Sequence, residues 1–336
     1  MIRVVVVEDS ASQRAHLVKA LEAEGDISVV ALAADAGAVL AVVQEHRPEV
    51  VTVDLQLPGG GGNHAIEQIM AFAPTPILVL SATVTGPQSE AAMGALVAGA
   101  LDALPKPARW TVAAEAELRK RVRALRGATV LRHPRGRRSG PPDPSKGGRP
   151  MPVVAVAAST GGPPALAKVL AGLDGLRAAV LVVQHLHPDF IDGFVTWMAR
   201  ASPLPVQAAT NGTPLQAGAV YIAPGGTHLK VAKGRLLLDP EPRSLHRPSA
   251  DELFRSVARG TGARAVGVLL TGMGDDGADG LLAMRAAGAH TIAQDERTSA
   301  VYGMPRVAKS LGAAVEVLPL DAIAEAVKRS MKRVTG

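Results

Sequence analysis

The chain has 336 residues, a formal net charge of +6 and no cysteine. This length is typical of two domains of ordinary size, and the absence of cysteine excludes disulfides, a thiolate nucleophile and a Cys-ligated metal. The chain has no uncharged apolar run of 18 residues, and its start, MIRVVVVEDSASQR, is not typical of a signal peptide. We therefore expect a cytoplasmic protein without a membrane-spanning helix.

Residues 1–107 alternate between short apolar runs and helix-like segments. The apolar runs predict five strands, which are RVVVV (3–7), SVVALA (28–33), VVTVD (50–54), PILVLS (76–81) and LDAL (101–104). Because these runs are continuously apolar, we expect a parallel sheet with helices on both faces, which is a doubly wound α/β domain. A helix at about 111–126 follows, and we place the first domain at residues 1–125.

Polar side chains follow four of these predicted strands. Glu8 and Asp9 come after the first strand, Asp54 ends the third, Ser81 ends the fourth and Lys106 follows the fifth. Three carboxylates at one edge of a sheet repel each other unless a cation lies among them, and Mg²⁺ prefers oxygen ligands. The set predicts an aspartate that accepts a phosphoryl group in the presence of Mg²⁺, with the lysine and the serine in contact with the phosphate oxygens.

The same residues give the first domain a family resemblance. Residues 1 to about 125 resemble a two-component receiver domain through VVVEDS, VTVDLQLP, LVLSA and LPKP, in that order and spacing. The resemblance implies a flavodoxin-like fold with Asp54 as the phosphorylation site. It also implies that Mg²⁺ is held by Glu8, Asp9, Asp54 and the backbone carbonyl of Gln56, and that Ser81 and Lys106 contact the phosphoryl group.

Two positions depart from the receiver pattern. Ala103 stands where the family often has an aromatic switch residue, and an alanine has no side-chain rotamer to switch. The turn after Pro58 reads GGGGN, and four glycines raise the entropy cost of ordering it. We expect a mobile loop beside the phosphorylation site.

A basic segment separates the two halves of the chain. Residues 127–150 are rich in Gly, Pro and Arg and cannot form a core. Residues 119–149 hold eleven Lys and Arg and a single acid, a balance of +10 that leaves the remainder of the chain at −4. This distribution favours a flexible basic linker, placed at 126–150, over a nucleic-acid-binding fold, and no nucleic-acid partner is expected.

A second α/β series begins after the linker, and we place the second domain at residues 151–336. Its predicted strands are VVAVAAS (153–159), AAVLVVQHL (178–186) and AVGVLLTGMG (265–274), each followed by a helical pattern. Residues 218–239 contain short strands and repeated glycines, which predict β-hairpins. We expect a second doubly wound parallel sheet, Rossmann-like, with a β-hairpin insertion.

Ser159 ends the first strand of this domain, in the stretch VAVAASTGGPPAL. Backbone N–H groups at a helix N-terminus favour negative charge, which suits either the oxyanion of a hydrolytic serine or a bound phosphate. The glycines that follow would let a substrate approach. The serine could also simply cap the helix. Because Ala157 replaces the first glycine of a G-x-S-x-G elbow, the stretch alone leaves all three interpretations open.

A nucleophilic serine needs a base and an orienting acid. His185 ends the second predicted strand, and Asp275 and Asp276 follow the third, so these residues meet Ser159 at one edge of the sheet. Three rival bases lie past the strand end or in hairpin and loop segments: His187, His228 and His246. We prefer His185 because it ends an apolar strand of the same sheet as the serine.

Residues from about 152 to 336 resemble the catalytic domain of the chemotaxis protein-glutamate methylesterase family (CheB type). The matching segments are AASTGGPPAL, VVQHLHPDF, YIAPGGTHL, HRPSADELFRSVA, LLTGMGDDGADGL and TIAQDERTSAVYGMP. The resemblance implies a serine esterase with Ser159 as nucleophile, His185 as base and Asp276 as orienting acid. It also implies that the Met273 N–H donates to the oxyanion, that Thr160 steadies the histidine, and that this domain needs no cofactor.

Together the two resemblances imply phosphorylation-regulated hydrolysis of glutamyl methyl esters, and deamidation of glutamines, on methyl-accepting chemoreceptors during chemotactic adaptation. A chemotaxis histidine kinase would be the phosphodonor, and the protein would be peripheral to receptor arrays at most. The alternative is a response regulator whose C-terminal domain binds a ligand or a protein without catalysis. STGG and PGG could cradle phosphates, but no Walker lysine follows STGG, and this alternative leaves His185 and Asp276 unexplained.

Overall fold

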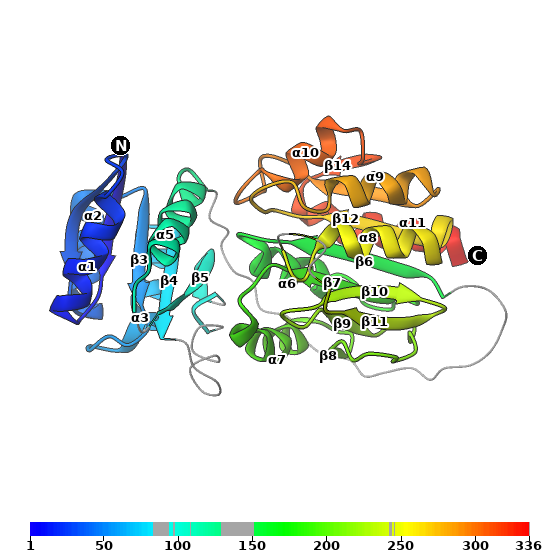
Figure 1. Ribbon diagram of the computed structural model, residues 1–336, viewed down its shortest axis with the longest axis horizontal. Helices are drawn as coiled ribbons and strands as arrows, with labels where there is room; N and C mark the ends of the chain where they lie inside the picture. Colours follow the sequence, from blue (N-terminus) through cyan, green and yellow to red (C-terminus); the bar gives the residue numbers. More distant parts are fainter. Residues whose placement is uncertain are drawn as a thin grey trace. The chain divides into compact units, whose positions relative to one another are not determined.

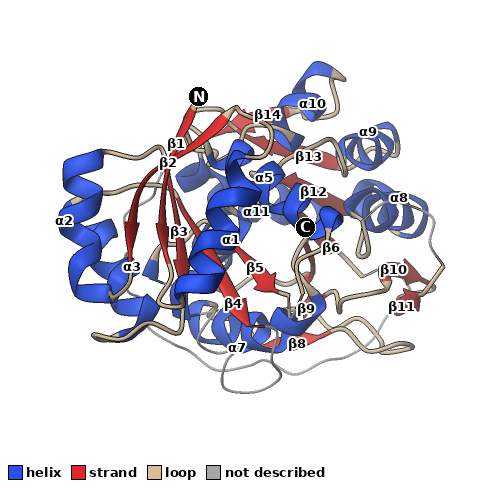
Figure 2. Ribbon diagram, turned by 60° about the vertical axis from the view of Figure 1, so that its left-hand side comes forward, coloured by secondary structure: helices blue, strands red, loops and turns tan. Residues whose placement is uncertain are grey.

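The computed structural model describes residues 1–82, 94–96, 98–107, 109–128, 151–241, 244 and 246–335. The chain divides into two compact units, Met1–Pro134 and Arg135–Gly336. Most of the predicted linker, 126–150, lies outside the described residues. In both units helices and strands alternate along the chain (Figures 1 and 2). No helix among the described residues is long and apolar enough to cross a membrane.

Unit 1 is a parallel sheet of five strands in the order β2-β1-β3-β4-β5. The strands are β1 (Ile2–Val7), β2 (Ile27–Ala33), β3 (Val50–Asp54), β4 (Ile77–Ala82) and β5 (Asp102–Lys106). The described helices are α1 (Ala11–Glu22), α2 (Ala36–His46), α3 (Gly61–Phe72) and α5 (Val112–Leu125). Helix α1 packs beside α5 and α2 beside α3, one pair on each face, so the doubly wound, flavodoxin-like prediction is confirmed.

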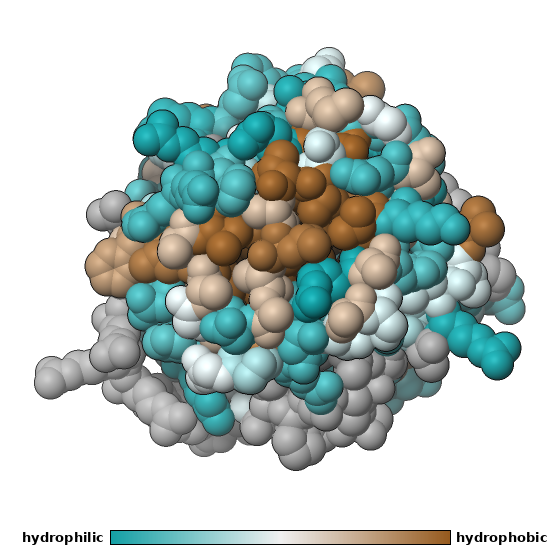
Figure 3. Space-filling view, turned by 90° about the vertical axis from the view of Figure 1, so that its left-hand side faces the viewer, coloured by the Kyte–Doolittle hydropathy of each residue, from teal (hydrophilic) through white to brown (hydrophobic). Residues whose placement is uncertain are grey.

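Burial explains why the apolar runs of unit 1 became strands. Val4, Val5 and Val6 are fully buried, as are Leu17 of α1 and Ile66 of α3. β-Branched residues fit such a sheet that is covered on both faces. The edge strand β2 is less covered, since Leu32 is 47% exposed. Figure 3 shows a band of hydrophobic residues across the face of the molecule that lies on the left in Figure 1.

Unit 2 is a parallel sheet of seven strands in the order β14-β13-β12-β6-β7-β9-β8. These strands are β6 (Val153–Ala158), β7 (Ala179–Gln184), β8 (Val206–Ala208), β9 (Val220–Ile222), β12 (Ala265–Leu269), β13 (His290–Gln294) and β14 (Glu316–Leu318). Two further strands, β10 (His228–Ala232) and β11 (Arg235–Asp239), form a separate antiparallel hairpin. The prediction of a parallel α/β domain with a hairpin insertion is therefore confirmed.

Helices cover both faces of the larger sheet. Helices α8, α9 and α10 pack in a row, and α6 packs against both α7 and α11. The helices are α6 (Gly162–Ala171), α7 (Ile191–Ala201), α8 (Ala250–Gly260), α9 (Ala278–Ala286), α10 (Met304–Ser310) and α11 (Leu320–Thr335), with short 3₁₀ turns η1 (Pro188–Phe190) and η2 (Gly262–Arg264). Helix α8 also packs on β10, so the hairpin is attached to the α8 side of the unit (Figure 1).

Residues 218–239 fold differently from the prediction in one respect. Only β10 and β11 form a hairpin, whereas β9 joins the main sheet and pairs in parallel with β7 and β8. A short apolar run such as VYI does not reveal its partner, and here it is fully buried in the sheet. The strand expected at 265–274 also ends early, at Leu269, because the glycine-containing segment 271–274 forms a loop.

Each sheet changes its winding direction at one place. In unit 1 the chain winds from β1 to β2 on one side, and β3 continues on the other side. In unit 2 it winds from β6 to β7 on one side and from β12 to β13 on the other. Loops at the carboxyl ends of the strands diverge at such a point and leave a crevice. Asp54 ends β3 and Ser159 follows β6, so both predicted reactive residues lie at these crevices.

Candidate functional site

The acidic residues of unit 1 form one cluster. Carboxylate oxygens of Glu8, Asp9 and Asp54 all lie within 4.8 Å of one another. Glu8 and Asp54 are buried, whereas Asp9 is exposed. The Nζ atom of Lys106 lies 2.6 Å from Glu8 Oε2 and 2.5 Å from Asp54 Oδ2. The structure thus brings together four of the predicted residues at the carboxyl edge of the sheet.

The charges in this cluster act on each other. Burial raises the pKa of Glu8, a hydrogen bond from Lys106 opposes that rise, and the charge of Asp54 adds to it. Burial works to lower the pKa of Lys106, but its hydrogen bonds to Asp54 and Glu8 outweigh burial and raise it. The ammonium group of Lys106 thus pairs with two of the three clustered carboxylates, Glu8 and Asp54. An oxygen-only donor set with excess negative charge fits Mg²⁺.

For Gln56 and Ser81, the remaining predicted residues of this site, the structure gives contacts of the backbone. The Gln56 N–H donates to Asp54 Oδ1 at 3.1 Å, so the chain turns back toward the aspartate directly after β3. Ser81 lies in β4, where its backbone pairs with Pro105 of β5. The Ser81 side chain lies outside the described part of the molecule.

The glycine turn beside Asp54 has a geometric cause that the sequence analysis missed. The segment 59–61 has φ angles of 78°, 113° and 80°, in the left-handed region that favours glycine. A Cβ atom on Gly62 would overlap the carbonyl oxygen of Asp54. These glycines are therefore needed to bring α3 against the end of β3. Ala103, the other departure, is buried in β5 beside Val79 of β4.

In unit 2, Ser159 and His185 leave the ends of neighbouring strands at the same level. The register pairs Ala158 of β6 with Gln184 of β7, and the His185 N–H donates to the Ala158 carbonyl at 3.0 Å. Ser159 is 5% exposed and His185 is 8% exposed. Paired strands place residues at matching positions on the same face of the sheet, so the predicted nucleophile and base are neighbours.

Gln184, which was not among the predicted site residues, links Ser159 and His185. Its Nε2 atom donates to the carbonyl oxygens of Ser159, at 2.9 Å, and of His185, at 3.0 Å. Both partners are acceptors, which fixes the orientation of the buried amide. A Cβ atom on Gly162 would overlap Gln184 Oε1. This glycine therefore makes room for the protein's own glutamine rather than for a substrate.

Asp276 is the predicted acid that the structure joins to the histidine. His185 Nε2 lies 2.8 Å from Asp276 Oδ2. The same carboxylate accepts hydrogen bonds from the Ser249 hydroxyl at 2.8 Å, the Ala250 N–H at 2.7 Å and the Asp251 N–H at 3.1 Å. Burial works to raise the pKa of Asp276, but the hydrogen bond with His185 and the helix N–H groups outweigh it and hold the pKa well below its usual value.

The aspartate that orients the histidine is itself fixed by two helix starts. Asp276 binds the N-terminal N–H groups of α8, and Asp251 of α8 accepts from the Gly277 N–H at 3.0 Å and the Gly280 N–H at 2.6 Å at the start of α9. Each helix therefore caps the other. The available sequence signal was the S-x-x-E capping box of Ser249 and Glu252, which predicts a helix start but not its carboxylate partner.

The bond to Asp276 leaves the other ring nitrogen of His185 for a nucleophile. With Nε2–H donated to the carboxylate, Nδ1 carries the lone pair. Nδ1 is buried and has no hydrogen-bond partner in the described part of the chain, so no hydrogen bond to Ser159 is formed. Such bonds are often long in an unliganded site and shorten when substrate binds.

The rival histidines have other surroundings. His187 is exposed, and its ring accepts from the Asp189 N–H at the start of η1. His228 is fully buried at the start of β10, and burial lowers its pKa. His246 is exposed and stacks on His185, with 4.3 Å between ring centroids and 13° between ring planes. Neither His187 nor His228 occupies the place that His185 holds beside Asp276.

The loop that carries Met273 packs directly on Ser159. A Cβ atom on Gly272 would lie 2.7 Å from Ser159 Cβ, and the Ser159 N–H donates to the Thr271 carbonyl at 3.0 Å. The Thr271 N–H in turn donates to Gln294 Oε1 at 2.8 Å. These contacts hold the backbone of the Met273 segment next to the serine. A backbone N–H at this place can donate a hydrogen bond to an oxyanion that forms beside Ser159.

Two predictions about the start of α6 have different outcomes. The N-cap of α6 is Gly161, with φ of 73° and no side-chain cap, so the interpretation of Ser159 as a helix cap is wrong. Thr160 is buried, and its carbonyl accepts from the Thr271 hydroxyl at 3.0 Å. The structure therefore places Thr160 against the Met273 loop. Its proposed effect on the histidine stays a prediction.

Two family models match the chain. Residues 4–123 match the response regulator receiver domain, and residues 154–327 match the CheB methylesterase model. The second match covers more than half of the chain and includes Ser159, His185 and Asp276.

Similar proteins cover nearly all of the chain. It is 46% identical to protein-glutamate methylesterase/protein-glutamine glutaminase 2 of Anaeromyxobacter dehalogenans (strain 2CP-C), over 97% of this chain and 96% of the relative. It is 39% identical to protein-glutamate methylesterase/protein-glutamine glutaminase of Agrobacterium fabrum (strain C58 / ATCC 33970), over 97% and 96%. The crystal structure of the Thermotoga maritima CheB methylesterase catalytic domain matches with a TM-score of 0.51 and 33% identity, over 53% of this chain and 98% of that chain.

Proposed function

Because this chain belongs to the CheB methylesterase family and begins with a receiver domain, we propose that it hydrolyses γ-glutamyl methyl esters on chemoreceptors with Ser159, His185 and Asp276. The observation that carries this proposal is the 2.8 Å bond between Asp276, a partly buried residue that caps α8, and His185, which follows the strand next to that of Ser159. Other histidines also pair with a carboxylate, as His290 does with Glu316 at 2.8 Å, but only His185 does so at the end of the strand beside Ser159 among the residues that the structure describes. The alternative of a non-catalytic C-terminal domain is disfavoured because relatives matched over nearly their whole length are named as enzymes.

The chemistry of the first half-reaction follows from this arrangement. His185 Nδ1 takes the proton of Ser159 as Oγ attacks the ester carbonyl carbon. The tetrahedral oxyanion receives a hydrogen bond from the Met273 N–H. His185 then returns the proton to the leaving oxygen, and methanol departs from a serine acyl-enzyme. Asp276 stabilises the imidazolium through Nε2–H in both proton transfers.

The second half-reaction uses the same groups. Water donates a proton to His185 and attacks the acyl carbon. His185 then returns the proton to Ser159 Oγ as the bond from the acyl carbon to Oγ breaks, which releases the glutamate side chain and restores the serine. A glutamine side chain has the same carbonyl, with an amide NH2 group in place of the methoxy group of the ester. The same steps would therefore release ammonia instead of methanol. Neither reaction requires a metal in this domain, because the residues supply both the base and the oxyanion donor.

For the receiver we propose that Asp54 Oδ attacks the phosphorus of a phosphodonor and becomes an acyl phosphate, while the bond between phosphorus and the donor group breaks and the donor group leaves with its electron pair. Glu8, Asp9, Asp54 and the Gln56 carbonyl would hold Mg²⁺, which neutralises charge on the phosphoryl oxygens. Lys106 is already bonded to Asp54 and would pair with the new phosphoryl oxygens, and the Ser81 hydroxyl would donate to them. A chemotaxis histidine kinase would be the natural phosphodonor for such a receiver.

The order of the domains suggests how the two activities are coupled. We assign residues 1–125 to the receiver, 126–150 to a basic linker and 151–336 to the esterase. Phosphorylation of Asp54 shifts the population of domain arrangements toward those in which the serine is accessible. Substrate glutamates on receptor helices would place the protein in the cytoplasm, peripheral to the receptor array.

Methanol release from a methylated chemoreceptor tests this proposal. The full-length protein is expected to release methanol, and a small-molecule phosphodonor with Mg²⁺ is expected to speed the release. Ser159→Ala should abolish turnover without a change in circular dichroism, and Asp54→Asn should remove only the stimulation. Full activity of the Ser159 variant, or undiminished stimulation of the Asp54 variant, would overturn the corresponding assignment.

A further inference from the structure

The ring of His246 stacks on the flat face of His185, the proposed base, which forms no hydrogen bond within the triad. Both nitrogens of the His185 ring have assigned roles. Nε2 bonds to Asp276, and Nδ1, which is buried and has no partner in the described part of the chain, is the atom proposed to take the proton of Ser159. The flat face of the ring has no such bond. His246 lies parallel to that face, with 4.3 Å between centroids and 13° between planes. This is closer than the range of about 4.5–7 Å that is usual for aromatic pairs.

A single hydrogen bond does not fix the plane of an imidazole ring. The ring can still tilt about the Nε2 contact with Asp276, and a tilt moves Nδ1 out of line with the serine. A second ring stacked on the face opposes this tilt, because tilting separates the faces or makes them clash. His246 is exposed whereas His185 is 8% exposed, so the stacked ring also covers the base on the solvent side.

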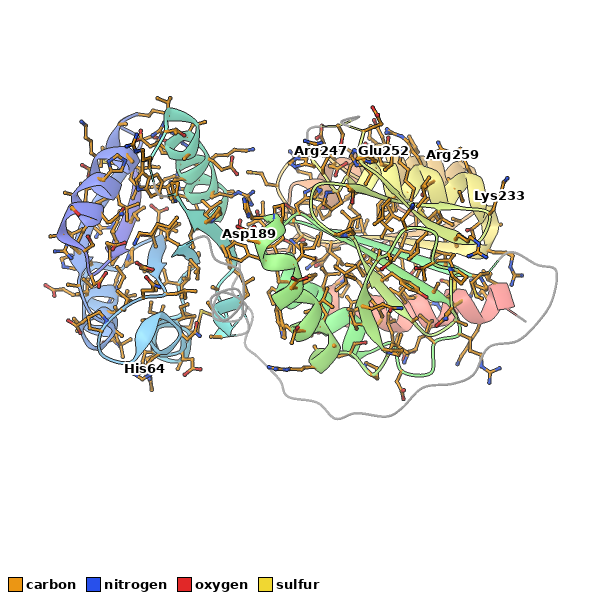
Figure 4. The ribbon with its side chains drawn as sticks, turned by 60° about the horizontal axis from the view of Figure 1, so that its bottom comes forward. His64, Asp189, Lys233, Arg247, Glu252 and Arg259 are labelled. Carbon is orange, nitrogen blue, oxygen red and sulfur yellow. The ribbon has the colours of Figure 1, made fainter. Side chains whose placement is uncertain are left out.

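The backbone around His246 is held in place. Its carbonyl accepts a hydrogen bond from the Ser244 hydroxyl at 2.7 Å, and the carbonyl of Arg247 accepts from the Gly226 N–H at 3.3 Å. Pro248 and Ser249, which follow, are buried. The segment then enters α8, whose first N–H groups bind Asp276. Figure 4 shows Arg247, the neighbour of His246, at the same end of α8 as Glu252 of its first turn.

One segment, 246–251, therefore contacts both the base and the carboxylate that orients it. Through His246 it contacts the face of the His185 ring, and through the start of α8 it fixes the carboxylate that holds the edge of the ring. We infer that His246 is a positioning residue that holds the imidazole plane of His185 for proton transfer from Ser159. This role rests on the proposed function, and it uses the aromatic face of His246 rather than its nitrogens.

The test replaces His246 by Ala and by Phe in the full-length protein, activated with a phosphodonor and Mg²⁺, and measures kcat and KM for methanol release. A phenyl ring can stack but cannot carry a proton. His246→Ala is expected to lower kcat about tenfold with KM within about twofold, and His246→Phe is expected to stay within about threefold of the wild type. His187→Ala is the matched control, an exposed histidine on the same edge whose ring contacts Phe190, and should leave kcat unchanged.

Two results would overturn the inference. If His246→Ala keeps the wild-type kcat, the stacked ring does not position the base. If His246→Phe loses as much as His246→Ala, the ring nitrogens rather than the aromatic face are needed. Failure of the proposed function is visible separately, because in that case the wild type itself releases no methanol or Ser159→Ala remains active.

Discussion

The two candidate sites of this protein lie at the same topological position in their sheets but are held together by different interactions. Each is at the carboxyl edge of a parallel sheet where the winding direction changes, between β1 and β3 in unit 1 and between β6 and β12 in unit 2. The unit 1 site is made of charged side chains that contact each other directly. In the unit 2 site the carboxylate that bonds to the histidine, Asp276, contacts no cationic Lys or Arg among the described residues and is fixed by helix N–H groups and a hydroxyl.

The difference follows from what each site has to do. A phosphoacceptor gains negative charge, so it needs cations nearby, and Lys106 and the proposed Mg²⁺ supply them. A serine esterase develops charge only transiently, on the imidazolium and the oxyanion, so it needs groups held in fixed directions rather than a cluster of cations. Fixed directions come from backbone packing, which is why glycines, a buried amide and capped helices surround Ser159 and His185.

The largest effect should come from removing the carboxylate that bonds to His185 in unit 2. Asp276→Asn keeps the shape of the side chain but no longer stabilises the imidazolium or holds its tautomer. We expect kcat for methanol release to fall about 10³–10⁴-fold, as is typical for loss of this acid in a triad. Phosphorylation of Asp54, measured on a phosphate-affinity gel, should be normal. A loss smaller than tenfold would mean that Asp276 only caps α8.

Paired glycine substitutions should break one site at a time. Gly272→Ala places a Cβ atom 2.7 Å from Ser159 Cβ and should reduce methanol release about 100-fold while phosphorylation continues. Gly62→Ala pushes against the Asp54 carbonyl and should do the reverse, leaving unstimulated esterase activity intact. Gly260→Ala is the control, because its nearest neighbour would be the Val231 carbonyl oxygen at 3.7 Å. Loss of both activities in either test variant would refute this separation.

A smaller effect is expected at Gln184. Gln184→Met keeps the volume of the side chain but removes the amide that bonds to the Ser159 and His185 carbonyls. We expect about a tenfold fall in kcat with little change in KM, because only the alignment of the two residues is disturbed. Gln216→Met, at an exposed position of the same unit, should be neutral. A change confined to KM would assign Gln184 to substrate binding instead.

The smallest effect is a pH dependence of stability with opposite sign in the two units. The pKa of Asp276 is lowered in the folded state, so its contribution is present above its ordinary pKa of 3.8 and is lost as the pH falls. The pKa of Glu8 is raised above its ordinary 4.5, so its contribution is present below that value and is lost as the pH rises.

Calorimetry without Mg²⁺ should resolve this difference. At pH 7, Asp276→Asn is expected to lower the Tm of its unit and Glu8→Gln to raise that of the other, each by about 2–4 °C. The Glu8 difference should shrink as the pH falls toward 4, whereas the Asp276 difference should persist at pH 4 and shrink only below the ordinary pKa of 3.8. Shifts of the same sign in both variants at pH 7 would contradict the assigned pKa directions.

The sequence was most informative where function requires a charge at a strand end. Glu8, Asp54 and Lys106 could be predicted because each lies at or just after the end of an apolar run. The carboxyl ends of parallel strands lie along one edge of the sheet, so these residues come close together. Ser159 and His185 could be placed on one sheet edge by the same rule. The choice of Asp276 over Asp275 depended on family resemblance, because spacing alone does not say which of two adjacent carboxylates turns inward.

The missed residues share a physical reason. The pairing of β9 with β7 and the stacking of His246 on His185 join segments far apart in the chain, and the contact of Gly62 with the Asp54 carbonyl depends on how the intervening turn folds back. No local pattern encodes such contacts. Gln184 is the exception, because a buried amide at the end of an apolar strand is a visible signal that something nearby must accept its hydrogen bonds.

The central claim is that Ser159, His185 and Asp276 act as one unit, and comparison of single and double variants tests it most directly. Methanol release should be measured for Ser159→Ala, for His185→Ala and for the double variant, with circular dichroism as a check of folding. If the residues form one proton-transfer chain, the double variant should be no slower than Ser159→Ala, within about twofold. Losses that multiply in the double variant would show that the serine and the histidine act independently, and would contradict the triad.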